Sequence, residues 1–112
     1  MNKDTLNKNT VSYHDEFIGS LKDPNEAYVY LQVAIEEYQE DNDTEALLVA
    51  LRNIADAQGG MTELARKTHL NRQNLYSILS TKGNPRLDTF GLVLKGLGFK
   101  LTIEQDKRAH AA

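Results

Sequence analysis

Apolar residues recur every three or four positions along most of the chain, which is the period of helices that bury one face. The pattern predicts a short helix over residues 12–22 and a longer helix over residues 23–41. Asp23 is expected to cap the longer helix, because its side chain can accept a hydrogen bond from a free N–H group of the first turn. Pro24 then takes the first helical position, where its missing N–H costs nothing. Residues 1–11 are polar and are expected to form a flexible arm.

Four shorter helices are predicted in the rest of the chain from the same period and from stop signals such as glycine. The first is expected to begin at a cap at Asn42 or Asp43 and to stop at Gly59-Gly60. The second is expected to be capped by Gly60, with Glu63 at the third helical position, and to end near Thr68. The third is predicted from a cap at Asn71 to about Ser80, and the last from Leu87 to a stop at Gly98.

After the last helix the period changes from helical to alternating. Phe99, Leu101 and Ile103 alternate with polar residues, which predicts one short strand over residues 99–105. A lone strand leaves its backbone hydrogen-bonding groups unpaired, a state that proteins usually avoid. We therefore expect this strand to pair with a second copy of the chain, with an N-terminal segment or with a partner's sheet.

The stretch LARKTHLNRQNLYSIL, residues 64–79, predicts a helix-turn-helix, because two short apolar-periodic segments flank a break at residues 68–71. Ala65 is small enough to let the second helix pack closely against the first. The apolar residues expected to face inward are Leu64, Leu70, Leu75 and Ile78.

The second of these helices is predicted to read DNA bases. The 3.6-residue period places Arg72, Gln73, Tyr76 and Ser77 on one side, opposite Leu75. Arginine can bind guanine and glutamine can bind adenine in bidentate fashion from the N-terminal end of a helix in the major groove. The predicted base-contacting residues are Asn71, Arg72, Gln73, Tyr76 and Ser77, and the predicted phosphate-contacting residues are Lys82 and Arg86. An ordinary pair of amphipathic helices would show a similar pattern, but basic residues gather around this one.

Charge is distributed unevenly. The net charge is −3, yet residues 1–45 hold three lysines against eleven acids, whereas residues 46–112 hold ten basic residues against five acids. This asymmetry suggests an acidic half for a basic partner and a basic half for an anionic partner, unless it is only an uneven spread of solvating charge. The predicted organisation is one all-α domain over residues 12–112, with acidic N-terminal helices (12–41), a helix-turn-helix core (42–98) and the C-terminal strand (99–105).

Composition indicates a soluble cytoplasmic protein that is not an enzyme. The chain has no cysteine, its polar start MNKDTLNKNT does not resemble a signal peptide, and its longest apolar run is too short to span a membrane. His14, His69 and His110 fall on three different elements, so a metal site is not expected. No nucleophile–base pair and no phosphate-binding loop is recognisable, and no cofactor is expected.

The run from Ala50 to Glu104 resembles the addiction-module antidote family, a branch of the Xre/Cro-type, lambda-repressor-like helix-turn-helix proteins. The matching motifs are Ala50-Leu51-Arg52, the GGM-ELAR stretch, LY-IL, GNPR-DT and the terminal LG-F-L-IE. One departure is His69, where glycine is commoner in the turn. The resemblance implies a homodimeric antitoxin of a type II toxin–antitoxin module, which neutralises a RelE/ParE-type toxin and binds operator DNA to repress its own operon.

The acidic half, residues 12–45, is the predicted toxin-binding surface, since a toxin that cleaves RNA is expected to have a basic active face. Its candidate contact residues are Tyr28, Tyr30, Glu36, Glu37, Tyr38 and Glu40. Two alternatives stay open: an Xre-type regulator without a toxin partner, and a protein-interaction module without a DNA role.

Overall fold

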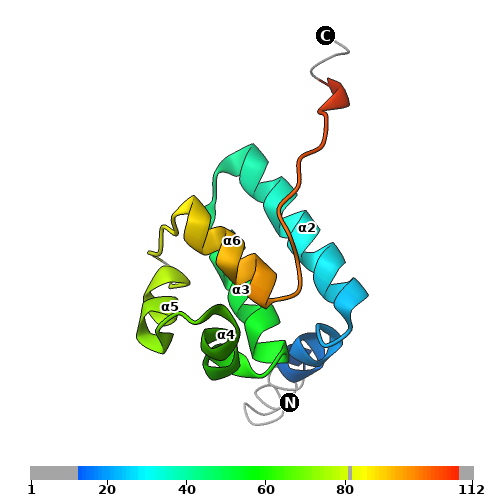
Figure 1. Cartoon of the computed structure of the whole chain (residues 1–112). Coiled ribbons are helices and arrows are strands. Elements are labelled where there is room, and N and C mark those ends of the chain that lie inside the picture. Colours follow the sequence, from blue (N-terminus) through cyan, green and yellow to red (C-terminus); the bar gives the residue numbers. More distant parts are fainter. Residues whose placement is uncertain (1–12, 81, 109–112) are drawn as a thin grey trace.

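The helices occupy nearly the segments that the apolar pattern predicts. The computed structural model describes residues 13–80 and 82–108, so the predicted flexible arm over residues 1–11 and the start of the first helix at residue 12 lie outside the described residues. Helical residues 13–20 come first (Figure 1). They are followed by α2 (Pro24–Asp41), α3 (Thr44–Ala57), α4 (Gly60–Thr68), α5 (Arg72–Ile78) and α6 (Leu87–Gly96).

Capping residues set these boundaries. The Asp23 carboxylate accepts a hydrogen bond from the Asn25 N–H at 2.9 Å, and Pro24 opens α2, as predicted. Of the two candidate caps for α3, the cap is Asp43, whose carboxylate accepts from the Ala46 N–H at 3.2 Å. Asn42 instead ends α2 in a left-handed conformation (φ 58°), where its N–H donates to the Tyr38 carbonyl at 2.7 Å.

The predicted start of α4 is wrong by one residue. Gly59, at φ 110°, is the N-cap, and Gly60 is already the first helical residue. Only glycine adopts such a conformation without strain, so the pair of glycines both ends α3 and begins α4. Glu63 therefore lies at the fourth helical position, and its carboxylate binds Arg66 rather than closing a capping box.

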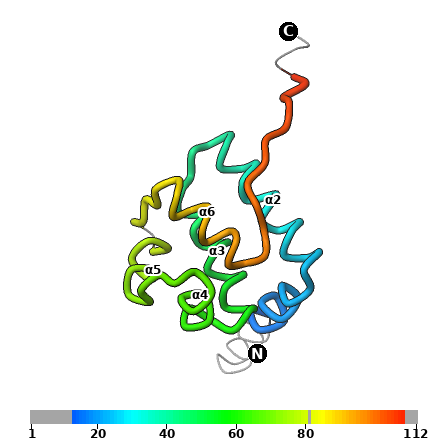
Figure 2. The backbone as a smooth tube through the Cα atoms, in the orientation of Figure 1, coloured from blue at the N-terminus to red at the C-terminus, as the bar shows by residue number. Residues whose placement is uncertain are grey.

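The core lies where five helices meet, with α3 at its centre. α2 packs on α3, α3 packs on α4, and α4 packs on both α5 and α6 (Figures 1 and 2). Removing this apolar surface from water is the main source of stability for such a bundle. The largest fully buried side chains are Leu48, Leu51, Ile54, Leu75, Leu79, Val93 and Leu94.

The N-terminal helices are part of this core rather than an appendage. Leu21, Ala27 and Leu31 are buried against it. The ring of Phe17 meets that of Tyr30 edge to face, with 5.1 Å between the centroids, which joins helical residues 13–20 to α2. The acidic segment is thereby held in a fixed position relative to the basic segment.

The predicted C-terminal strand is absent. Within the described residues no strand forms, and residues 99–106 are an extended segment that runs away from the helices toward the C-terminus (Figures 1 and 2). The Phe99 N–H donates to the Leu94 carbonyl at 2.8 Å, but Leu101 is half exposed and Ile103 is fully exposed. Alternation describes which side chains share a face, whereas a strand also needs a neighbour for its backbone groups, and no described segment supplies one.

The helices are amphipathic or short. The longest of them, α2, has 18 residues and buries Ala27 and Leu31 on one side only. Within residues 13–80 and 82–108, no helix has both the length and the apolar character needed to cross a membrane.

Candidate nucleic-acid interface

The turn between α4 and α5 consists of residues 69–71. His69 ends α4 in the left-handed conformation, with φ 60° and ψ 20°. Histidine tolerates this region better than bulky β-branched residues do, so the turn keeps the shape that glycine would give it, at some cost. The departure from glycine at this position therefore leaves a sharp turn in place.

A buried threonine, which the sequence pattern did not single out, helps to shape this turn. The Thr68 hydroxyl donates to the Leu64 carbonyl at 2.8 Å and accepts from the Leu70 N–H at 3.3 Å. Buried polar groups are stable only when they are hydrogen-bonded, and here one hydroxyl satisfies the first free N–H after the helix. The sequence does contain a signal for this contact: a threonine that follows a core leucine by four residues at a helix end can bond to that leucine's carbonyl.

Asn71 has a structural task that limits its predicted role. Its side-chain oxygen accepts hydrogen bonds from the N–H groups of Gln73 (2.8 Å) and Asn74 (3.3 Å), which caps α5. With the oxygen engaged, the amide NH₂ group is the part of Asn71 that can still contact a ligand. Asn71 is therefore a helix cap first and a candidate donor second.

α5 has one buried side and one exposed side. Leu75 and Leu79 are fully buried and Ile78 is half-buried. The exposed side brings together the other four predicted base-contacting residues, Arg72, Gln73, Tyr76 and Ser77. The helical period alone was sufficient to separate these two sides.

Arg72 is held by Tyr76 one turn further along the helix. Its guanidinium donates to the Tyr76 hydroxyl at 3.4 Å, and its central carbon lies 5.5 Å from the centre of the ring. This stacking and hydrogen bonding restrict the side chain to fewer conformations. The guanidinium has five N–H donors, so one bond to Tyr76 leaves others available.

The two predicted phosphate-contacting residues lie on the loop after α5. Lys82 is exposed and adjoins Gly83, whose N–H donates to the Ser80 carbonyl at 2.9 Å. The loop is tight, because a Cβ atom on Gly83 would lie 2.0 Å from the Ile78 carbonyl oxygen. Lys82 therefore lies near the C-terminal end of α5, about 10 Å along the helix from Arg72.

Arg86 lies further along this loop and immediately precedes α6. Its side chain is 85% exposed and forms an ion pair with Asp88 at 3.5 Å. Exposed pairs of this kind are weak, so Arg86 can exchange Asp88 for another anion at little cost.

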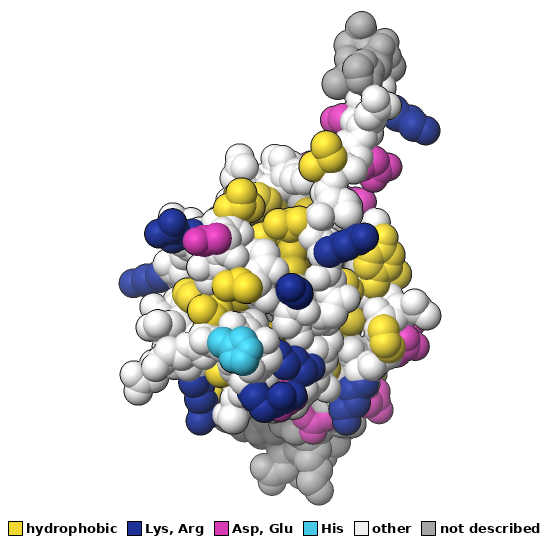
Figure 3. All heavy atoms as spheres, viewed as in Figure 1, with side chains coloured by type: hydrophobic (Ala, Val, Ile, Leu, Met, Phe, Trp, Pro, Cys, Tyr) yellow, Lys and Arg dark blue, Asp and Glu magenta, His cyan; other side chains and the backbone are white. Residues whose placement is uncertain are grey.

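α4 adds two basic residues, Arg66 and Lys67, to this part of the molecule. On the face drawn in Figure 3, dark-blue side chains gather over the region of α4. Arg66 is partly neutralised, because it donates two hydrogen bonds to Glu63. This bonding also holds the pKa of the Glu63 carboxyl below its usual range.

The predicted toxin-contacting residues do not form one surface. Glu36, Glu37 and Glu40 are exposed along α2, as is Tyr28. Tyr30 lies about 160° from Tyr28 around the helix. It is half-buried, and its hydroxyl accepts from the Asn53 amide at 3.0 Å.

Tyr38 is half-buried and packs against the core. Only part of its ring is therefore exposed to a partner. The structure thus brings Tyr30 and Glu37 together at a groove between α2 and α3, and leaves Tyr28 and Tyr38 elsewhere.

Comparison with known proteins identifies the family. The profile of a family described as "Probable addiction module antidote protein" matches residues 16–105, which is most of the chain. An uncharacterized protein of Haemophilus influenzae (strain ATCC 51907 / DSM 11121 / KW20 / Rd) is 33% identical over 79 residues, covering 70% of this chain and 80% of that protein. No solved structure matches significantly. The chain therefore belongs to the family of probable addiction module antidote proteins.

Proposed function

We propose that the chain is a DNA-binding antitoxin of a type II toxin–antitoxin module, which neutralises a RelE/ParE-type toxin and represses its own operon. The family supplies the antidote role in general terms. The observation that supports DNA binding is the exposed side of α5, where Arg72 and Gln73 follow directly after a well-formed cap at Asn71.

In the proposed complex, α4, the turn and α5 act as a lambda-repressor-like helix-turn-helix of the Xre type. The N-terminal end of α5 enters the major groove, where Arg72 contacts guanine and Gln73 contacts adenine. Tyr76 and Ser77 support them from the next turn, and Asn71 donates from its amide. Lys82 and Arg86, on the loop after α5, bind phosphates beside the helix and fix its position on the duplex.

The protein acts as a homodimer on a two-fold site, so that two copies of α5 reach two half-sites one helical turn apart. Phosphate contacts release counterions, so affinity falls steeply as salt concentration rises. Neutralisation uses the acidic half of the chain against the basic face of a toxin that must hold RNA. Long-range attraction of this kind mainly speeds association.

The test measures binding of the purified chain to the DNA upstream of its own reading frame, by fluorescence anisotropy at several salt concentrations. A scrambled duplex of equal length is the control. Preference for the upstream DNA, with two chains per site by sedimentation analysis, supports the proposal. Equal and weak binding to both duplexes would favour a protein-interaction module without a DNA role.

Co-expression with the product of a neighbouring reading frame for a short basic protein tests the antitoxin role. Restored growth of cells that express this protein supports neutralisation. DNA binding without any such rescue would favour an Xre-type regulator that has no toxin partner.

A further inference from the structure

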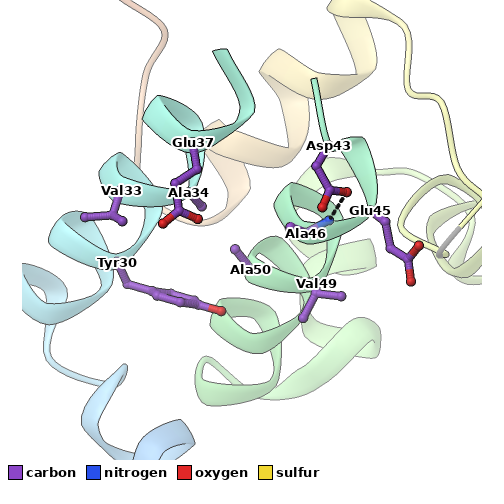
Figure 4. A pocket seen from close by; sticks show the side chains of 9 residues that line it. All are labelled: Tyr30, Val33, Ala34, Glu37, Asp43, Glu45, Ala46, Val49 and Ala50. Carbon is purple, nitrogen blue, oxygen red and sulfur yellow. Dashed lines mark hydrogen bonds between the residues drawn. The ribbon is translucent and has the colours of Figure 1, made fainter. Parts of the chain in front are cut away.

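A groove of about 490 Å³ lies between α2 and α3 (Figure 4). In Figure 1, α2 and α5 lie on opposite sides of the bundle. Its apolar part is formed by Val33, Ala34, Ala46, Val49 and Ala50. The small side chains of the three alanines leave space between the two helices unfilled. Figure 4 shows the ring of Tyr30 extending from α2 toward α3, and the Asn53 amide holds its hydroxyl at 3.0 Å.

The charged residues that line this groove are all acidic. Glu37 reaches it from α2, whereas Asp43 and Glu45 lie at the start of α3. The surrounding sequence gives no local compensation, because residues 23–51 include eight acids and no lysine or arginine. Within residues 13–80 and 82–108, none of these three carboxylates forms an ion pair. An apolar floor bordered by such carboxylates is complementary to a bulky apolar side chain flanked by basic ones.

We propose that this groove is the main docking site for the toxin, and that it takes a basic amphipathic segment of that protein. This inference rests on the proposed neutralising function. It narrows the toxin-binding surface from the whole acidic half to the groove. An apolar side chain of the segment enters between Val33 and Val49, and its neighbouring lysines or arginines pair with Glu37 and Glu45. The exposed carboxylates outside the groove attract the toxin but do not fix its position.

Two neighbouring glutamates on α2 provide a matched charge test. Both are exposed, but Glu37 lines the groove whereas Glu36 points about 100° away around the helix. Glu37→Lys and Glu36→Lys change the net charge identically. Affinity of each full-length variant for the purified product of the neighbouring toxin reading frame is measured by calorimetry. We expect about a tenfold loss for Glu37→Lys and less than about a twofold loss for Glu36→Lys.

Two valines one turn apart on α2 provide a matched apolar test. Val33 lines the groove and Val29 does not, and both are about half exposed, at 46% and 55%. Val33→Ser should weaken toxin binding by about tenfold, while Val29→Ser should leave it nearly unchanged. All four variants should keep the helical circular dichroism and the DNA affinity of the unaltered chain, which shows that they still fold.

The possible outcomes separate this inference from the proposed function. Equal losses within both pairs, or no loss in any variant, would overturn the groove as the docking site while leaving neutralisation intact. If Glu37→Lys changed self-association in sedimentation but not toxin affinity, a second copy of the chain would be the occupant instead. Absence of binding by the unaltered chain would contradict the neutralising function itself, and the groove proposal with it.

Discussion

The polar side chains at the α4–α5 turn have different roles. Thr68 and Asn71 are engaged with backbone groups, so they shape the turn and the start of α5. Within the described part of the chain, the Arg72 side chain bonds to that of Tyr76, which is a contact that DNA can replace. The sequence predicted both the exposure of Arg72 and the cap at Asn71, but its period could not show that Arg72 is hydrogen-bonded to Tyr76.

Alanine substitution at Arg72 should separate base reading from general attraction. Arg72→Ala should cost about 1–3 kcal/mol on the cognate site, with less effect on random DNA, because a bidentate base contact is lost. Lys82→Ala, the control, should weaken both complexes alike and flatten the salt slope by about one unit. Anisotropy titrations give both quantities, and equal losses on both duplexes for Arg72→Ala would remove Arg72 from the reading role.

Replacement of Thr68 should test the shape of the turn. Thr68→Val keeps the volume but removes the hydroxyl that accepts from the Leu70 N–H, so we expect the free energy of unfolding to fall by about 1–3 kcal/mol. Urea denaturation measures this change. Thr68→Ser retains the hydroxyl, so its free energy of unfolding should fall by less. A Thr68→Val protein as stable as the unaltered chain would show that the hydroxyl does not matter here.

Among the helices, the sequence predicted the starts that a capping side chain sets. It predicted less well the ends that depend on how the chain packs after the helix. Asp23 and Asn71 cap the helices that the sequence assigns to them. α5 ends at Ile78 rather than near Ser80, because the residues that follow turn into the loop around Gly83. The prediction of the C-terminal strand was wrong for a different reason: alternation in residues 99–105 cannot reveal whether a neighbouring strand exists.

The close approach of α6 to α4 gives a test with a control on the same helix. A Cβ atom on Gly96 would lie 2.8 Å from the Thr68 methyl group and 2.9 Å from a Leu64 methyl group. Gly96→Ala should therefore separate α4 from α6 and lower the free energy of unfolding by about 1–3 kcal/mol.

Gly91 is the control, because the nearest atom to its added Cβ is a Leu101 methyl group at 3.9 Å, an ordinary contact. Gly91→Ala should be neutral or should stabilise α6 by up to about 1 kcal/mol, through the higher helix propensity of alanine. Thermal unfolding compares the two variants. Similar stabilities would mean that α4 and α6 can move apart without cost.

At the scale of the whole molecule, charge of one sign dominates two separate helices of one core: α2 carries five acids and no lysine or arginine, whereas α5 carries Arg72 and no acid. α2 packs on α3, and α5 packs on α4, so the groove and the exposed side of α5 belong to different parts of the bundle. The sequence predicted this division through its charge asymmetry. It could not predict the groove, because the pattern of one helix does not show how closely two helices approach.

Removal of the acidic helices should damage the fold as well as any binding surface. A fragment that starts near Asp41 lacks Leu21, Ala27 and Leu31, which are buried in the core. We expect it to melt at a clearly lower temperature than the full chain, since α3 would expose the apolar side that α2 covers. Circular dichroism measures this melting. A fragment as stable as the full chain would show that the helix-turn-helix core folds without the acidic helices.

Because α2 and α3 contain no lysine, their side chains can enter amide cross-links only through carboxyl groups. Reagents that attach to amines leave both helices unlabelled, whereas a carbodiimide activates their aspartates and glutamates. Any amide that then joins α2 to another protein must take its carboxyl from this chain and its amine from the partner. Trypsin would release α2 and most of α3 as one peptide, from Asp23 to Arg52, so mass spectrometry could identify the partner lysine directly.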